Sequence, residues 1–384
     1  MKSEQASTTP QTPQAGANTP PVSPQAMGPE SSSHTLWIIG GIGAVILLAA
    51  AGGWFYFTRS ISSGAEAGKI VRIGLSLDSV KIQRWADERD VMVKKATEMN
   101  ATVTTFSAEN DDATQISQIE NLISQKVDVI IIVAHDADAV GPIITKAQQA
   151  GIKVIDYDRL TRGGVPDLYL SFDSVKVGEI AAQYVVDAAI KTKSVPNIAY
   201  FAGSPTDNNT YLVSEGVMKV LEPLIKTGKI KLVYNEFTKD WSPSEAYSNA
   251  KKFLDSGGKV DGAVTAYDGL AYGVIQALTE RKLAGLVPVS GQNGELQAVQ
   301  RIVAGTQTVT AWKPGKPLAE RAVEAAVDFA QGRIPETNGT INNKTAEVKA
   351  YLFDPIPVTK ENVRDTVIKS GTFSEAEVYG SPAP

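Results

Sequence analysis

The segment KVIDYDRL, residues 153–160, places charges of both signs where a buried strand ends. Val154 and Ile155 are β-branched residues typical of a sheet interior, whereas Asp158 and Arg159 follow shortly afterwards. A direct ion pair between Asp158 and Arg159 would explain the two charges by structure alone, without a binding role. It is geometrically awkward, because an extended strand directs successive side chains to opposite faces. We therefore expect these charges to complement a ligand at the edge of the sheet, and each other while the site is empty.

Polar and aromatic residues follow several other expected strands in the same way. In parallel α/β sheets, ligands bind outside the carboxyl ends of the strands. The sequence therefore predicts one binding edge, and we assign to it Arg84, Trp85, Asp158, Arg159, Asp207, Asn209, Trp241, Tyr267, Asp268, Asn293 and Lys313.

Carboxylates, amides, cationic donors and indoles together suit a carbohydrate. Sugar hydroxyls both donate and accept hydrogen bonds, and arginine and carboxylate groups each contact adjacent hydroxyls in a fork. Hydrogen bonds to charged groups contribute about 1.5–3 kcal/mol each, and a micromolar complex requires about 8 kcal/mol. Trp85 and Trp241 lie in polar loops and are expected to stack on the sugar, whereas Trp312 lies within a strand and has a core position as an equal alternative.

The elements that must position these residues alternate regularly from residue 69 onward. Continuous apolar strands such as 127–134 alternate with amphipathic helices such as 82–99 and 113–126. This pattern predicts an α/β fold with parallel sheets covered on both faces. A second series of strands and helices of similar length begins near residue 175, which indicates two similar lobes.

The N-terminal part has a different composition. Residues 1–34 are rich in Pro, Ser, Thr and Gln and are expected to be a disordered tail, and residues 59–68 a linker. Between them, the segment 36–57 carries no charge, and we predict a transmembrane anchor over 35–58. A cleavable signal peptide ending at 65–67 is the alternative, but its apolar core would be shorter and nearer the cleavage site.

Composition excludes several classes of protein and site. A net charge of -5 argues against a nucleic-acid binder. There is no cysteine, which excludes disulfides, thiolate nucleophiles, cysteine-bound zinc and cysteine lipidation, and two histidines are too few for a histidine-based metal site. We expect no cofactor, no metal and no enzymatic activity. The acids lie among arginines and a lysine, which would hold their pKa values down and so exclude glycosidase chemistry.

Several long ordered segments from about residue 70 to 370 resemble the xylose-binding branch of type I periplasmic binding proteins, which serve bacterial ABC importers. These segments are RIGLSLDSVKIQRWADERD, ISQIENLI, IKVIDYDRL, LSFDSVKVGE, GSPTDNN and SGQNGELQAVQRIVAGTQTVTAWKP. The resemblance implies two Rossmann-like lobes joined by a three-strand hinge, with residues 69–174 plus 313–345 in the N-terminal lobe and 175–312 plus 346–384 in the C-terminal lobe.

The resemblance also implies a function. A monomeric chain would capture a monosaccharide, D-xylose or a related aldose, by lobe closure and deliver it to an ABC permease. Its binding domain would lie outside the cell membrane, held there by the single-pass anchor. The alternative is an extracellular sugar sensor that signals to a chemoreceptor or histidine kinase.

The predicted site residues match the sugar contacts of that family except at two positions. Tyr267 stands where the relatives have asparagine, and Asn293 stands where they have aspartate. A phenol is bulkier than an amide, and an amide lacks the charge of a carboxylate. Both substitutions alter the volume of the pocket or the pattern of hydroxyls that it accepts.

Overall fold

The computed structural model describes residues 69–380. The tail, anchor and linker that we expected at 1–34, 35–58 and 59–68 lie outside these residues. Within 69–380, none of the helices combines the length and apolar character needed to cross a bilayer.

A seven-stranded sheet forms the centre of the first lobe, with the strand order β11-β12-β5-β4-β3-β1-β2. Each neighbouring pair is parallel except β11 and β12, which form an antiparallel hairpin. The strands are β1 (Val71–Leu77), β2 (Ala101–Ser107), β3 (Val129–Ile132), β4 (Lys153–Tyr157), β5 (Leu168–Phe172), β11 (Gly339–Asn342) and β12 (Glu347–Phe353).

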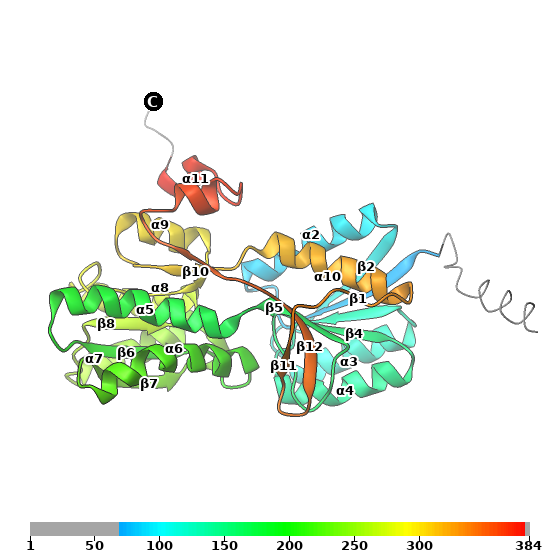
Figure 1. Cartoon of the computed structure of the whole chain (residues 1–384), viewed down its shortest axis with the longest axis horizontal. Helices are drawn as coiled ribbons and strands as arrows, with labels where there is room; N and C mark the ends of the chain where they lie inside the picture. Colours follow the sequence, from blue (N-terminus) through cyan, green and yellow to red (C-terminus); the bar gives the residue numbers. More distant parts are fainter. Residues whose placement is uncertain (1–68, 381–384) are drawn as a thin grey trace, which may run out of the picture. The chain divides into compact units, whose positions relative to one another are not determined.

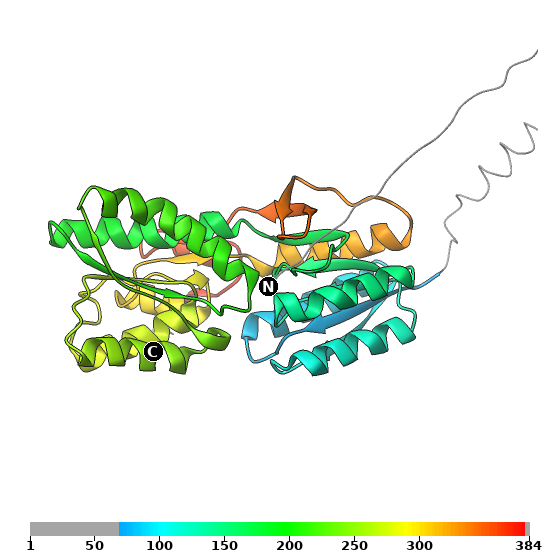
Figure 2. The same cartoon turned by 90° about the horizontal axis from the view of Figure 1, so that it is seen from below.

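Helices cover both faces of this sheet (Figure 1; Figure 2). They are α2 (Gln83–Glu98), α3 (Asp112–Ser124), α4 (Ala137–Gln149) and α10 (Gly315–Ala330). The central strand β3 shows the reason, because its apolar side chains alternate between the two faces. Val129 and Ile131 pack in a cluster with α2 and α10, whereas Ile130 and Ile132 pack in a cluster with α3 and α4. This packing on both faces confirms the buried sheet that the continuous apolar strands predicted.

The second lobe contains two three-stranded sheets, with the orders β7-β6-β8 and β13-β10-β9. Its strands are β6 (Asn197–Ala202), β7 (Lys231–Phe237), β8 (Gly262–Thr265), β9 (Gln292–Asn293), β10 (Thr310–Trp312) and β13 (Ile356–Val358). Its helices are α5 (Ser174–Thr192), α6 (Asn208–Lys226), the 3₁₀ turn η1 (Lys239–Trp241), α7 (Pro243–Asp255), α8 (Asp268–Glu280), α9 (Leu296–Ala304), the π turn η2 (Arg364–Ile368) and α11 (Glu375–Tyr379). The main apolar core of this lobe lies between β6, β8 and the helices α5 to α8.

The chain passes between the lobes three times: after β5, after β10 and after β12. The third passage corrects one predicted boundary. We assigned residues 346–384 to the second lobe, but β12 pairs in parallel with β5 through contacts such as Ala350 with Tyr169. The hairpin with β11 carries β12 back onto the first sheet, so the chain enters the second lobe only after Phe353.

Candidate functional site

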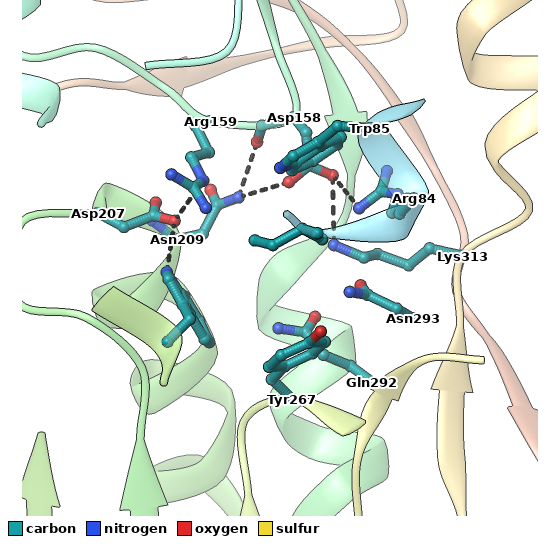
Figure 3. A pocket seen from close by; sticks show the side chains of 12 residues that line it. Arg84, Trp85, Asp158, Arg159, Asp207, Asn209, Tyr267, Gln292, Asn293 and Lys313 are labelled. Atoms are coloured by element: carbon teal, nitrogen blue, oxygen red, sulfur yellow. Dashed lines mark hydrogen bonds and ion pairs between the residues drawn. The ribbon is translucent and has the colours of Figure 1, made fainter. Parts of the chain in front are cut away.

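A small cavity lies where polar strand ends of the two lobes meet (Figure 3). The empty space in and around it is about 350 Å³, open solvent included. It is lined by Ile82, Arg84, Trp85, Asp158, Arg159, Asp207, Asn209, Trp241, Tyr267, Gln292, Asn293 and Lys313. All the residues that we predicted for the binding edge are therefore brought to this cavity, with the exception of Asp268.

The first lobe contributes side chains from two strand ends. Arg84 and Trp85 lie in the first turn of α2, which follows β1. Asp158 and Arg159 follow β4, and the backbone of Asp158 has φ 60°, a left-handed conformation that Asp adopts more readily than most residues. The chain leaves the sheet at this turn, which places both charged groups at the edge.

The second lobe contributes the remaining side chains through helix starts and strand ends. Asp207 is the N-cap of α6, where its carboxylate accepts a hydrogen bond from the backbone of Asn209 at 2.8 Å. Trp241 ends η1, and Tyr267 directly precedes α8. Asn293 ends β9. Lys313 follows β10, in the second passage between the lobes.

Asp158 is held by two cations. Its Oδ2 lies 2.8 Å from Nη1 of Arg84 and 3.2 Å from Nζ of Lys313, and Arg84 also contacts Glu88 at 2.6 Å. Burial raises the pKa of the Asp158 carboxyl, but Arg84 and Lys313 outweigh this effect, and the pKa lies well below its usual range. Burial lowers the pKa of Lys313 from 10.5 to about 8, although Asp158 opposes that change.

Arg159 is held by two acids. Its Nη1 lies 2.8 Å from Asp78 and its Nε lies 2.9 Å from Asp207, which belongs to the second lobe. Burial raises the pKa values of both carboxyls, and Arg159 counteracts that effect. Within residues 69–380, no ion pair joins Arg159 to the adjacent Asp158. Each neighbour therefore has ion-pair partners of its own, which differs from the expectation that the two charges complement each other while the site is empty.

Polar contacts across the cavity connect the two lobes. The side-chain amide of Asn209 donates to the backbone oxygen of Asp158 at 2.7 Å, and Tyr169 donates to the Asn209 Oδ1 at 3.2 Å. Outside the cavity, the backbone amide of Ala137 donates to the carbonyl of Thr206 at 3.1 Å. Together with the Arg159–Asp207 ion pair, these contacts hold the lobes against each other.

Two indoles line the cavity from opposite lobes. The guanidinium of Arg84 lies 4.6 Å from the ring centroid of Trp85. Trp241 donates through Nε1 to Asp207 at 3.2 Å and meets the ring of Tyr267 edge to face. For Trp312 we left a stacking position and a core position open. Its ring takes the core position, in an apolar cluster of the second lobe.

Asp268 corrects the prediction of a direct ligand contact. Its side chain is fully buried behind the cavity and is not part of the lining. It accepts hydrogen bonds from the backbone amides of Gly294 and Glu295 at 2.9 and 3.0 Å and from the side chains of Gln307 and Thr310. These partners come from the chain that follows α8, so the carboxylate turns inward and organises the loop that carries Asn293.

The structure also adds residues that we did not assign to the site. Gln292 lines the cavity beside Asn293, and its strand-end position was a usable signal. Glu88 orients Arg84 and receives a hydrogen bond from Tyr157. Its spacing of four residues from Arg84 on a helix could have indicated the pair. Ile82 also lines the cavity, but an apolar residue before a helix carries no specific signal.

Three buried polar atoms of lining residues have no hydrogen-bond partner within the described part of the chain. They are Nη2 of Arg84, Nε1 of Trp85 and Oδ1 of Asn293. Two are donors and one is an acceptor. Because buried polar atoms are nearly always paired in native proteins, these atoms mark positions where a ligand would supply partners.

No group of three or more acidic or histidine side chains is placed to hold a metal ion within residues 69–380. The lining groups are suited to hydrogen bonding and ring stacking. Such a lining favours recognition of a small polar molecule.

Comparisons with known proteins cover most of the chain. The family model described as "Periplasmic binding protein domain" matches residues 73–334. The D-xylose-binding periplasmic protein of Haemophilus influenzae is 41% identical over 321 residues, which cover 83% of this chain and 96% of that protein. The D-xylose-binding periplasmic protein of Escherichia coli is 40% identical over 321 residues, with the same two coverages.

A solved structure agrees with these similarities. The carbohydrate transporter solute binding protein of Chloroflexus aurantiacus, determined in complex with D-glucose, is 30% identical to this chain. The two structures match with a TM-score of 0.75, over 80% of this chain and 98% of that one.

Proposed function

Because the chain belongs to the periplasmic binding protein family, we propose that it captures a neutral monosaccharide outside the cell and passes it to an ABC permease. Its fold is the type I α/β fold of that family, and, as its relatives are binding proteins, it is not an enzyme. The lining residues, D-xylose as the preferred sugar, the closing motion and the membrane anchor are parts of this proposal.

The three unpaired polar atoms carry the proposal. Arg84 Nη2, Trp85 Nε1 and Asn293 Oδ1 offer two donors and one acceptor to a molecule in the cavity. A sugar hydroxyl both donates and accepts, so one class of ligand satisfies all three atoms. A purely apolar ligand would leave them buried and unpaired, at about 1–3 kcal/mol for each.

The charges of the site support a neutral ligand. Arg84 and Lys313 are paired with Asp158, and Arg159 is paired with Asp207, all within 3.2 Å. A sugar acid or an amino acid would have to compete with these existing pairs. A polyol instead receives hydrogen bonds from charged groups that remain paired, and such bonds are stronger than those between neutral groups.

D-xylose is the first choice of sugar. The relatives of Haemophilus influenzae and Escherichia coli are named for this pentose and share 41% and 40% of aligned residues with the chain. The Chloroflexus aurantiacus structure, at 30% identity, holds the hexose D-glucose. Tyr267 and Asn293 line the cavity and are the positions at which the hydroxyl pattern of the ligand is open to change.

Capture is proposed to proceed by closure of the lobes about the three passages of the chain, which would act as the hinge. The pair Arg159–Asp207 and the hydrogen bond from Asn209 to Asp158 join the lobes at 2.9 and 2.7 Å. Opening has to break both contacts. A sugar that bridges the same side chains stabilises the closed arrangement, because it interacts with both lobes only in that state.

The membrane anchor rests on composition alone, because the uncharged segment 36–57 lies outside the described residues. We expect the full chain to stay in the membrane pellet on alkaline carbonate extraction. Replacing Leu47 and Leu48 by lysine should release it, since each lysine at the centre of a span costs about 2.5–3.5 kcal/mol. Release of the unaltered chain by carbonate would contradict the anchor without affecting the sugar site.

Isothermal titration calorimetry of the full chain with D-xylose, D-glucose and a sugar acid tests the ligand. We expect D-xylose to bind with a Kd in the micromolar range or below, which corresponds to about 8 kcal/mol or more. The sugar acid should not bind. Absence of heat with every neutral sugar would overturn the proposed function.

Arg159→Ala should weaken D-xylose binding by about 2 kcal/mol or more, because a hydrogen bond from a charged donor is lost. Arg333→Ala is the matched control, because this arginine is 55% exposed and paired with Asp328 outside the cavity. Thermal unfolding of both variants establishes that they are folded. Equal effects of the two substitutions on affinity would contradict a specific contact at Arg159.

A further inference from the structure

The phenol of Tyr267 is fixed in position by three surrounding groups. Its hydroxyl donates a hydrogen bond to Oε1 of Glu295 at 2.7 Å. Its ring meets Trp241 edge to face, with the centroids 6.3 Å apart and the planes at 86°. On a third side it packs on Gly269, where an added Cβ would lie only 2.4 Å from the ring.

Glu295 is itself held from behind. Its backbone amide donates to Oδ2 of the buried Asp268 at 3.0 Å, as does that of Gly294 at 2.9 Å. Asp268 therefore acts on the cavity indirectly: it positions the loop that carries Glu295, and Glu295 positions Tyr267. This chain of contacts connects Asp268 to the site although Asp268 does not line the cavity.

The fixed hydroxyl determines what Tyr267 offers to a ligand. Because the hydroxyl proton is already donated to Glu295, Tyr267 can offer a ligand only an acceptor oxygen and the carbon atoms of its ring. In Figure 3, Tyr267 and Gln292 lie on the side of the cavity opposite Trp85 and Asp158. The ring therefore bounds the cavity on that side.

We propose that Tyr267, held by Glu295, is a specificity-determining residue that restricts the site to five-carbon sugars by excluding the additional hydroxymethyl group of a hexose. The inference rests on the proposed function, since it assumes that the cavity takes a monosaccharide. The proposed restriction would favour binding of D-xylose over D-glucose. Two relatives are named for D-xylose, and D-glucose occupies the solved structure from Chloroflexus aurantiacus.

The test compares the Kd values of D-xylose and D-glucose by calorimetry on full-length variants. A fitted pocket discriminates one methylene by about 10–200-fold. The hydroxymethyl group of a hexose is larger than a methylene, so we expect the unaltered chain to prefer D-xylose by at least a factor in that range. Tyr267→Ala should reduce the preference by about tenfold or more, chiefly by improving D-glucose binding. Tyr267→Phe keeps the ring but loses its hydrogen bond to Glu295, so it should reduce the preference less than Tyr267→Ala does.

Two further variants keep the test decisive if Tyr267→Ala does not fold. Glu295→Ala frees the phenol and should reduce the preference in the same direction but less than Tyr267→Ala. Tyr184→Ala removes a tyrosine of α5 that does not line the cavity and should leave the preference unchanged.

The outcomes separate the two proposals. If the unaltered chain binds neither sugar, the proposed function fails and the inference fails with it. If D-xylose binds but D-glucose binds equally well, the inference alone fails. An equal loss of both sugars in Tyr267→Ala, with an unchanged ratio, also overturns the inference, because it would identify the ring as a stacking surface for any sugar.

Discussion

Replacing Lys313 by methionine tests whether the site retains a charge that destabilises the fold. The amine is buried in the cavity, and among residues 69–380 only Asp158 lies within ion-pairing distance of it. Burial lowers the pKa of Lys313 from 10.5 to about 8. At about 1.4 kcal/mol per pKa unit, that difference corresponds to roughly 3 kcal/mol by which the folded protein disfavours the charged amine.

The sign of the effect defines the pH range of the experiment. Below about pH 8, Lys313 is protonated in both the folded and the unfolded chain, so its full cost is present. Between about pH 8 and 10.5, the unfolded chain holds the proton and the folded chain does not, so the free energy of unfolding rises with pH. Above that range the contribution is constant.

Methionine keeps the apolar length of the side chain but does not titrate. At pH 7, Lys313→Met should be at least as stable as the unaltered chain, because Asp158 retains Arg84 at 2.8 Å. The stability of the unaltered chain relative to the variant should then rise by about 3 kcal/mol between pH 7 and 10.5. D-xylose affinity should fall in the same variant, since a charged donor is lost.

Urea unfolding followed by circular dichroism at several pH values between 7 and 10.5 measures the difference. Lys316→Met is the control, because this lysine lies three residues away and its side chain is 74% exposed. A difference between Lys313→Met and the unaltered chain that stays constant over this range would refute the reasoning. A variant clearly less stable at pH 7 would refute it as well.

Two further substitutions test the packing of Trp241 in the site and the buried carboxyl of Asp156 in the first sheet. Gly203→Ala would place a Cβ 2.1 Å from the indole of Trp241 and should displace that ring. We expect a change in tryptophan emission and at least a tenfold loss of D-xylose affinity, on the order of 1.4 kcal/mol. Gly339→Ala is the control, because its Cβ meets no atom within 4 Å and should have neither effect. Burial raises the pKa of the Asp156 carboxyl from 3.8 to about 7, so the folded chain binds the carboxyl proton more tightly than the unfolded chain does. The free energy of unfolding should therefore fall by about 4 kcal/mol as pH rises from about 4 to 7. Asp156→Asn should remove that loss from the pH dependence of urea unfolding, and an unchanged slope would contradict the assignment.

The architecture of the site was accessible from the sequence because parallel strands end at a common edge. Apolar runs such as β3 and β4 identify strands buried on both sides, and the polar residues after them reach the same edge whatever the details of packing. Asp158 and Arg159 could be placed in this way, and so could Asp207 and Trp241 from the second lobe.

Side-chain direction and long-range pairing depended on the tertiary structure. Asp268 also follows a strand, yet it turns inward because Gln307 and Thr310, about forty positions away, supply its partners. The strand β12 joins the first sheet because its hairpin with β11 carries it beside β5. Neither partner choice is encoded in a local pattern.

The sequence by itself therefore determined which residue types gather at the predicted binding edge, since the periodicity of each strand and the residues that follow it require only local information. Tertiary structure decided which acid each cation pairs with, which polar atoms lack a partner in the cavity and where Tyr267 lines it. These features arise when segments distant in the chain pack together, and the burial that results sets both their contacts and their charges.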